Sequence, residues 1–240
     1  RKFIWNFTYK KSDYLISMTN LTKNYLIQNL NINENKIIKI DNPVISKKIK
    51  LLSYEKIDEE DSHIFEKKVF CTIGRLTRQK NYLELIKAFE IYSKKNHNNS
   101  NLIILGEGEE EKMLKKYLSK KKIINCYLLG FKKNPYRYLS KSSLYISSSL
   151  WEEPGHTLIE AGYLNVPILS SDCPNGPKEI IEHNNNGFKY KMKNIKDLEY
   201  NLTQISKLSE NNLFKIKLNM KKKTSTFTEH YFSKKIKNYL

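Results

Sequence analysis

From about residue 69 onward, short apolar runs typical of buried strands alternate with amphipathic helical stretches. We predict strands at residues 69–73, 101–105, 126–130, 144–149, 167–172 and 187–190, with helical segments between most of them. Strands that alternate with helices in this way form parallel βαβ units with right-handed crossovers. The sequence therefore predicts an α/β fold built on an open, doubly wound parallel sheet.

Glycines and charged residues cluster where the predicted strands end. Ligands of such sheets bind in the crevice beyond the carboxyl ends of the strands. The residues at these ends are Gly74 and Arg75, Gly106 and Gly108, Gly130 and Phe131, Glu152 to Gly155, and Asp172 to Pro177. We therefore expect five loops to converge on one binding crevice.

The chain divides into parts of different character. Residues 1–45 predict a strand, a helix and a second strand, which is too little for a domain, so we interpret them as the tail of a larger N-terminal domain. Residues 46–66 are polar with mixed charge and predict a connector between domains. Residues 67–210 form the predicted sheet domain, and residues 211–240 are predicted to be helical.

The composition is strongly basic, with 43 Lys and Arg against 25 Asp and Glu and a net charge of +18. Such a charge favours anionic partners such as nucleic acid, phospholipid headgroups or phosphorylated substrates. An alternative is that the lysines, spread among many Asn and Ile residues, reflect an AT-rich genome. The separated cysteines, Cys71, Cys126 and Cys173, indicate buried, reduced thiols of a cytosolic protein. No apolar run approaches the roughly 20 residues that span a bilayer.

Two glutamates eight positions apart, Glu152 and Glu160, flank a predicted loop and helix start after the strand at 144–149. The free N–H groups and positive dipole end of such a helix form an anion site. Carboxylates beside an anion site suit a ligand that also carries hydroxyls, because a carboxylate accepts two hydrogen bonds. The pair could instead be the acid and base of a glycosidase, but both would then lie on the same side of the ligand. A sugar nucleotide has both the phosphates and the hydroxyls.

Arg75 and Lys80 follow the first strand of the sheet and are five positions apart, so they could clamp a diphosphate. The simpler alternative is a pair of solvated surface cations. The spacing of a P-loop is absent. Gly106 and Gly108 begin like a dinucleotide fingerprint, but the third glycine is missing and three acids follow, which argues against a dehydrogenase. The histidines are scattered and predict no metal site.

Taken together, GRLTRQKN, LIILGEGEE, LLGFKKNPYRYL, SSSLWEEPGHTLIEAG and SSDCPNGPKEI resemble the C-terminal domain of retaining GT-B glycosyltransferases of family 4. The resemblance runs in order from about Val69 to Tyr190. It implies two Rossmann-like domains in the full protein, with the sugar-nucleotide donor held mainly by the C-terminal one. It also implies that the helices after residue 210 pack back against the N-terminal domain, which keeps the acceptor site.

The resemblance assigns roles to individual residues. Arg75 and Lys80, after Gly74, match the family's diphosphate-binding pair. Glu160 matches the glutamate that binds the donor ribose, and Glu152 matches the first glutamate of the motif, which contacts the donor sugar. The residues expected to contact phosphate and sugar between them are Gly155, His156, Thr157 and Leu158, and those expected to border the base are Phe131 and Lys132.

One departure from the family pattern concerns the residue after the first glutamate. The family usually has glycine there, whereas this chain has Glu153. That difference leaves the identity of the donor open. Catalytic contributions are expected from Glu152, Arg75 and Lys80, with no metal and no cofactor, because cationic side chains and helix N-termini offset the charge of the leaving diphosphate.

These expectations combine into one functional hypothesis and one alternative. The hypothesis is a cytoplasmic glycosyltransferase that moves a hexose or N-acetylhexosamine from a nucleotide-diphosphate sugar, such as a UDP-sugar, to a glycan or lipid-linked acceptor. An acceptor at the inner face of the plasma membrane would give the basic surface a purpose. The alternative is a basic nucleic-acid-binding module without catalytic activity, against which Tyr82, Tyr92 and Tyr117 occupy helical core or flank positions rather than a stacking platform.

Overall fold

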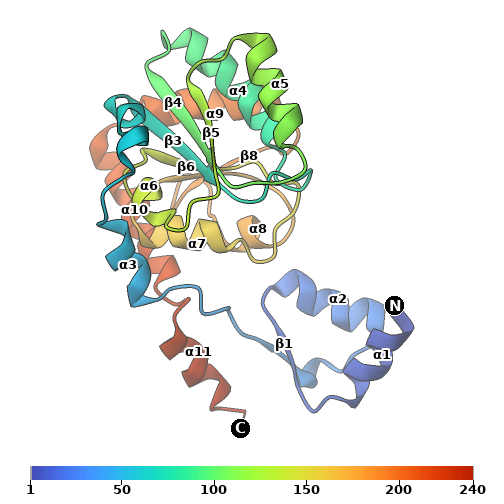
Figure 1. Cartoon of the computed structure of the whole chain (residues 1–240). Coiled ribbons are helices and arrows are strands. Elements are labelled where there is room, and N and C mark those ends of the chain that lie inside the picture. The colour runs from blue at the N-terminus through green and yellow to red at the C-terminus, as the bar shows by residue number, and fades with distance from the viewer. Residues whose placement is uncertain (1, 240) are drawn as a thin grey trace.

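The computed structural model describes residues 2–239, which form a larger and a smaller lobe (Figure 1). The smaller lobe contains helices α1 and α2 and a two-stranded parallel sheet. Its bounds are α1 Lys2–Lys11, β1 Leu15–Ser17, α2 Asn20–Leu30, η1 Glu34–Lys36 and β2 Ile37–Lys39. The strand, helix and strand predicted for residues 1–45 are therefore present, and an additional helix precedes them.

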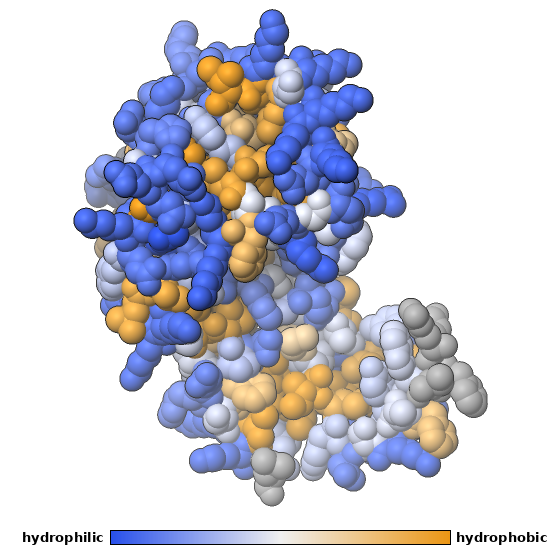
Figure 2. All heavy atoms as spheres, viewed as in Figure 1, coloured by the Kyte–Doolittle hydropathy of each residue, from blue (hydrophilic) through white to orange (hydrophobic). Residues whose placement is uncertain are grey.

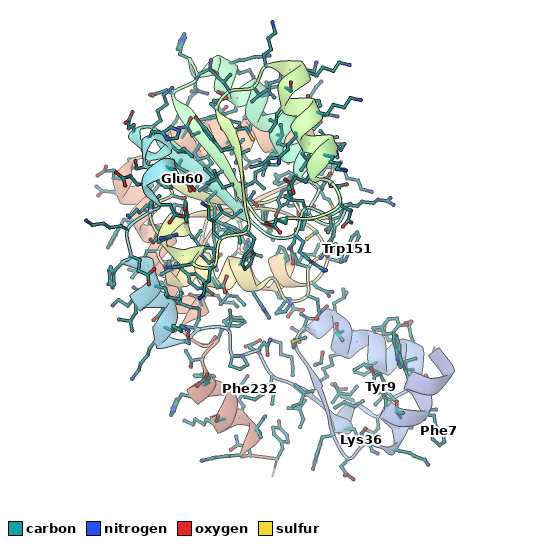
Figure 3. The ribbon with its side chains drawn as sticks, viewed as in Figure 1. Phe7, Tyr9, Lys36, Glu60, Trp151 and Phe232 are labelled. Carbon is teal, nitrogen blue, oxygen red and sulfur yellow. The ribbon has the colours of Figure 1, made fainter. Side chains whose placement is uncertain are left out.

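A small apolar cluster holds the smaller lobe together. Leu26, Leu30, Ile32 and Ile37 are buried in it, and Tyr9 packs against them. Lys36, seen near Tyr9 in Figure 3, donates to the backbone carbonyls of residues 10 and 12. These contacts fix α1 beside the two-stranded sheet.

The larger lobe is built on a six-stranded sheet in the order β5-β4-β3-β6-β7-β8, in which all the pairs are parallel. Its strands are β3 Lys68–Ile73, β4 Ser100–Leu105, β5 Cys126–Gly130, β6 Leu144–Ser147, β7 Ile168–Ser171 and β8 Phe188–Tyr190. The chain winds outward from β3 to β5 and then returns to β6 on the other side of β3. This is the predicted doubly wound sheet, and its switch point lies between β3 and β6.

Helices cover both faces of the sheet, as Figure 1 shows. The helices of this lobe are α3 Lys47–Ser53, η2 Glu59–Glu66, α4 Tyr82–Lys95, α5 Glu111–Lys121, α6 Tyr136–Leu139, α7 His156–Tyr163, α8 Gly176–Ile180, α9 Ile195–Ser206 and α10 Glu210–Thr224. Helix α11 Glu229–Ile236 follows α10 and extends away from the sheet, below the larger lobe (Figure 1). The segment 46–66, predicted as a connector, contains α3 and η2. Ile49 and Ile64 of these elements are buried in the core, so the segment packs against the sheet domain.

The two cores follow the alternation of side chains along each strand. Phe70, Leu102 and Ile104 point into one core, which α4 and α9 cover. The intervening residues, such as Cys71 and Ile103, point into the other, which α6 and α7 cover. All three cysteines are free and buried, as the sequence predicts.

Candidate functional site

Each loop at the carboxyl end of a strand contacts another of these loops. Gly106, after β4, lies so close to Gly74, after β3, that a Cβ atom on Gly106 would come within 2.1 Å of the Gly74 carbonyl oxygen. The amide of Gly106 also donates to the carbonyl of Gly130, the last residue of β5, at 2.7 Å. These two glycines therefore allow three loops to meet at one edge of the sheet.

The remaining loops join the same edge. Leu150, after β6, donates its amide to the carbonyl of Gln79 at 2.8 Å. Ser171, at the end of β7, donates its hydroxyl to the carbonyl of Ser149 at 2.5 Å. The five strand ends singled out in the sequence thus form one continuous rim.

An ion pair spans the switch point of the sheet. Lys80 Nζ lies 2.5 Å from Glu152 Oε1, which also accepts the Ser149 hydroxyl at 2.5 Å. The Glu152 side chain is only 9% exposed and that of Lys80 18% exposed. A buried carboxylate needs such partners, because an uncompensated charge is costly. The two residues predicted to contact the diphosphate and the donor sugar are therefore direct neighbours.

The start of α7 presents backbone N–H groups beside this pair. Gly155 precedes the helix with φ of 90°, and no side chain caps it. A side chain at this position would also crowd Leu158, whose Cδ1 would lie 2.9 Å from the added Cβ. The hydroxyl of Thr157 is turned inward and accepts a hydrogen bond from Tyr145 at 2.7 Å. With that hydroxyl engaged by Tyr145, no side chain caps the helix start, and its backbone amides are the groups expected to bind an anion.

His156 faces the segment that links the two lobes. Its Nε2 atom lies 3.0 Å from Asn42 Nδ2. Burial lowers the pKa of this imidazole below its usual 6.5, and nearby Lys80 acts in the same direction, against Glu152. The neutral ring can accept the Asn42 amide hydrogen through Nε2.

Glu160 lies one helical turn into α7 and is largely buried. Its Oε1 accepts a hydrogen bond from the Tyr136 hydroxyl at 2.9 Å. Burial raises the pKa of Glu160 above 4.5, and the bond from Tyr136 partly offsets this. A carboxylate with one of its two oxygens engaged has acceptor capacity left for ligand hydroxyls.

Arg75 lines a largely apolar cavity of about 350 Å³. Gly74, Phe131, Lys132 and Pro135 contribute to the same cavity. Pro135 immediately precedes Tyr136, the partner of Glu160, so this cavity lies next to the glutamate. An apolar cavity of this kind suits the base or ribose of a nucleotide.

The ammonium of Lys132, a residue expected to border the base, is held by acidic side chains. Its Nζ lies 2.7 Å from Asp61 and 3.1 Å from Asp58. Burial acts to lower the pKa of Lys132, but hydrogen bonds to Asp61, Tyr138 and Asp58 raise it above its usual value. Lys132 therefore fastens the 46–66 segment to the sheet domain, and its charge is neutralised there.

Three carboxylates meet near Lys132. Oxygens of Asp58, Glu60 and Asp61 lie within 4.8 Å of one another. Glu60 is labelled in Figure 3. The cations Lys132 and Arg137 bind Asp58, so two of the three negative charges of the cluster are already balanced by protein groups.

Glu153, which stands where the resembled family usually has glycine, connects the loop to the smaller lobe. Its carboxylate accepts hydrogen bonds from the hydroxyls of Thr19 at 2.9 Å and Thr22 at 3.1 Å, and from the Asn175 amide. Thr19 is the N-cap of α2. Glu179 supports the same helix end, because its Oε1 accepts the backbone N–H of Asn20 at 2.6 Å.

These two glutamates were not predicted as functional residues. Both place negative charge at the positive end of the α2 dipole, which stabilises the contact between lobes. The only sequence signal for the role of Glu153 was an acidic residue at a position where the resembled family usually has glycine. The partners of both glutamates in the smaller lobe are more than 130 residues away in sequence, which no local pattern reveals.

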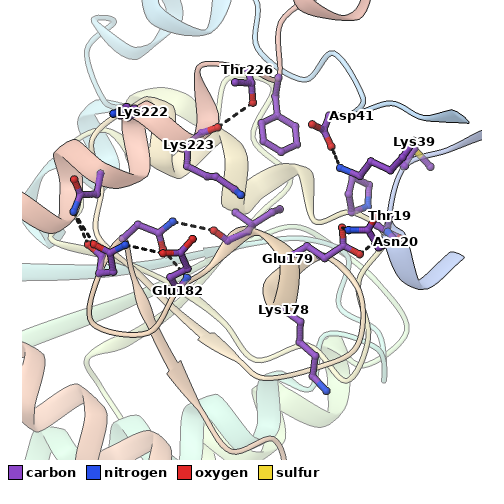
Figure 4. A pocket seen from close by; sticks show the side chains of 18 residues that line it. Thr19, Asn20, Lys39, Asp41, Lys178, Glu179, Glu182, Lys222, Lys223 and Thr226 are labelled. Atoms are coloured by element: carbon purple, nitrogen blue, oxygen red, sulfur yellow. Dashed lines mark hydrogen bonds and ion pairs between the residues drawn. The ribbon is translucent and has the colours of Figure 1, made fainter. Parts of the chain in front are cut away.

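Another cavity lies beside the predicted site. It measures about 800 Å³ and is formed by the start of α2, α8 and the end of α10 (Figure 4). Its charges are mixed: Lys39 is paired with Asp41, and Glu179 binds the amide of Asn20. Pro154 is the part of the Glu152–Glu160 segment that reaches it.

With this geometry in view, comparison with known proteins assigns the family. Residues 53–225 match the family described as Glycosyl transferases group 1, and the chain belongs to that family. An uncharacterized glycosyltransferase of Methanocaldococcus jannaschii is 37% identical over 179 residues, covering 74% of this chain and 44% of the relative. A poly(ribitol-phosphate) alpha-N-acetylglucosaminyltransferase of Staphylococcus aureus is 29% identical, covering 64% of this chain and 31% of the relative.

Solved structures show the same fold. A glycosyltransferase from Rickettsia africae superposes with a TM-score of 0.82 at 19% identity, over 99% of this chain and 65% of that one. HepE of Anabaena, in complex with UDP and glucose, gives a TM-score of 0.83 at 17% identity, again over 99% and 65%. The sheet domain therefore has the Rossmann-like α/β fold found in GT-B glycosyltransferases. The chain spans less than half the length of the curated relatives named above.

A membrane-spanning helix was not expected from the sequence. Within residues 2–239, every helix is too short or too polar to cross a bilayer.

Proposed function

We propose that this chain binds the donor of a retaining glycosyltransferase of family 4, which transfers a hexose or N-acetylhexosamine from a UDP-sugar to a glycan or lipid-linked acceptor. In this proposal, Arg75 and Lys80 bind the diphosphate together with the amides at the start of α7. Glu160 binds the ribose hydroxyls and Glu152 the donor sugar. The observation that carries the proposal is the Lys80–Glu152 pair at the switch point of the sheet, next to an uncapped helix start.

The chemistry of the proposed site is electrostatic. As the bond to the sugar breaks, negative charge develops on the leaving diphosphate. In the proposal, the Arg75 guanidinium, the Lys80 ammonium and the α7 amides stabilise that charge without a metal ion. Glu152 holds the lysine in place through the 2.5 Å contact.

The relatives support the proposed substrates by their names. The S. aureus relative transfers N-acetylglucosamine to poly(ribitol phosphate). A Campylobacter jejuni relative, 28% identical over 59% of this chain and 40% of its own length, transfers N-acetylgalactosamine to a diphospho-undecaprenol-linked sugar. Both acceptors are anionic, which suits a chain with a net charge of +18. We place the enzyme in the cytoplasm, at the inner face of the plasma membrane, in the synthesis of cell-surface polysaccharide, lipopolysaccharide or glycoprotein glycans.

The nucleic-acid-binding alternative has less support. Tyr82 and Tyr92 are 1% and 2% exposed, so neither can stack on a base. A thermal-shift comparison of UDP with an oligonucleotide at two salt concentrations separates the two functions, because nucleic-acid affinity falls steeply with salt.

Calorimetric titration of the chain with UDP tests the proposal. Arg75→Ala should weaken binding by about 1.5–3 kcal/mol through loss of a charge-assisted contact, and Glu160→Ala should also weaken it. Arg78→Ala is the matched control, since Arg78 is a nearby exposed arginine outside the proposed contacts. Equal affinities of the Arg75→Ala and Arg78→Ala variants would remove Arg75 from the site.

A further inference from the structure

Helix α10 has a buried face and an exposed face that is also apolar. Ile216 and Met220 point inward, and the Met220 side chain lies against Gly162 of α7. The opposite face carries Phe214 and Leu218, which are 64% and 55% exposed. Residues 214, 217, 218 and 221 share one helical face, so two lysines flank these two apolar side chains.

This face continues into a basic cavity beside α3. Lys50, Lys141 and Lys221 line a cavity of about 480 Å³, together with Tyr54 and Tyr163. Among the described residues, no carboxylate lines this cavity, and none of its three lysines forms an ion pair. Three unpaired ammonium groups around one hollow form a site for a phosphate group.

Further apolar side chains surround the cavity on α3. Leu51 is 69% exposed and Tyr54 is 71% exposed. Figure 2 shows hydrophobic residues gathered over α3 at the lower left of the larger lobe, beside strongly hydrophilic ones. We call this region the α3–α10 surface and define it by residues 50, 51, 54, 141, 214, 217, 218 and 221.

We propose that the α3–α10 surface docks the protein on an anionic lipid bilayer. Exposed Phe, Leu and Tyr side chains interleaved with lysines match the interfacial zone of a membrane, where apolar groups enter the acyl boundary and lysines meet the phosphates. The charge is complementary to such lipids, and Glu210, one turn before Phe214, is the nearest acid along α10. The proposal rests on the proposed function in one respect, namely that the acceptor lies at a membrane.

The position of the surface leaves the donor crevice open. Gly155, at the start of α7, belongs to the proposed donor site, whereas Tyr163 and Leu164, at its other end, line the basic cavity. An eight-residue helix is about 12 Å long. A bilayer at the α3–α10 surface therefore lies at the opposite end of α7 from the sugar nucleotide.

Co-sedimentation of the full 240-residue chain with lipid vesicles tests the proposal. Vesicles of phosphatidylcholine with phosphatidylglycerol should bind the chain, and vesicles of phosphatidylcholine alone should not. The K50E/K141E/K221E variant should bind the anionic vesicles at least about a hundredfold more weakly, because losing each lysine charge costs about fivefold and each added glutamate repels the anionic lipids. The F214S/L218S variant should lose binding at high salt, where the apolar contribution dominates.

The matched control reverses three exposed lysines on α5, in the variant K112E/K116E/K120E. This control should stay within about threefold of the unmodified chain, because it changes the net charge equally but lies on another helix. An equal loss in the control would show that net charge alone drives binding and would overturn the proposal. Competition by millimolar glycerol 1-phosphate would assign the cavity to a soluble phosphate and overturn it as well.

Two further measurements are needed. The first tests whether the surface binds a second copy of the chain instead of a bilayer. The second tests whether vesicle binding is independent of UDP binding at the donor site. If F214S/L218S converts a dimer into a monomer in analytical ultracentrifugation, the surface is a contact between copies of this chain, and the membrane proposal fails. UDP binding, measured on every variant, should be unchanged. A chain that binds anionic vesicles but not UDP would refute the donor site and leave the α3–α10 surface standing.

Discussion

The buried pair of Lys80 and Glu152 makes the most direct prediction about stability and binding together. With 2.5 Å between Nζ and Oε1, the gross attraction is about 7 kcal/mol at an effective dielectric constant of about 20. Most of it offsets the desolvation of the two charges. Lys80→Met removes the partner of a carboxylate that is 9% exposed, and we expect it to lower the free energy of unfolding by about 3 kcal/mol.

A double variant separates this structural role from the proposed ligand role. Lys80→Met combined with Glu152→Gln leaves no buried charge, and the Gln oxygen can still accept the Ser149 hydroxyl. We therefore expect the double variant to recover about 2 kcal/mol of the loss. It should still bind UDP about tenfold or more weakly than the unmodified chain, because its ammonium group is gone.

Urea unfolding measures the stabilities, and calorimetric titration with UDP measures the affinities. A Lys80→Met variant within about 0.5 kcal/mol of the unmodified chain would refute the buried pair. A double variant that binds UDP normally would refute Lys80 as a phosphate ligand. Lys80→Arg is the charge-retaining control, which should keep most of the stability while changing the contact geometry.

Three further predictions concern the rim and its support. Glu160→Gln should weaken UDP binding about tenfold at pH 7. Burial raises the pKa of Glu160 above 4.5. In titrations at several pH values, the difference in affinity between the variant and the unmodified chain should therefore shrink as the pH falls through that pKa. Asp58→Asn should cost about 1 kcal/mol at neutral pH, because the side chain is one-third exposed and screened. The Tyr138 hydroxyl and Lys132 lower the pKa of Asp58 from 3.8 to about 2, so urea midpoints should show this difference above pH 3.8 and lose it as the pH falls toward 2. Gly176→Ala would place a Cβ 1.6 Å from the Pro154 carbonyl oxygen, and we expect a loss of about 2 kcal/mol in the same unfolding assay.

The sheet domain could be predicted from sequence because its signals are local. The apolar run at 101–105 became β4 Ser100–Leu105, and the run at 126–130 became β5 with the same bounds. Chain winding then places their ends on one edge of the sheet, as observed for Gly106 and Gly130. The packing of the 46–66 segment was less predictable. Its mixed charge indicates an exposed connector, but Ile49 of α3 and Ile64 of η2 are buried in the core.

Side-chain partners were not predictable, because they depend on residues distant in sequence. Lys80 and Glu152 were both singled out, but their contact spans 72 positions. Lys132 was expected to border the base, and its ion pairs with Asp58 and Asp61, more than 70 positions away, could not be predicted. Glu153 was interpreted as a departure from the family's binding motif. In the structure, its carboxylate accepts a hydrogen bond from Thr19, the N-cap of α2 in the smaller lobe.

We propose above all that a nucleotide diphosphate binds at the switch point of the sheet. A crystal structure of this chain soaked with a UDP-sugar tests it most directly. We predict the diphosphate between Arg75, Lys80 and the amides at the start of α7, with the ribose hydroxyls on Glu160. Density for the nucleotide in the 800 Å³ cavity between α2, α8 and α10 instead, with the rim empty, would contradict it.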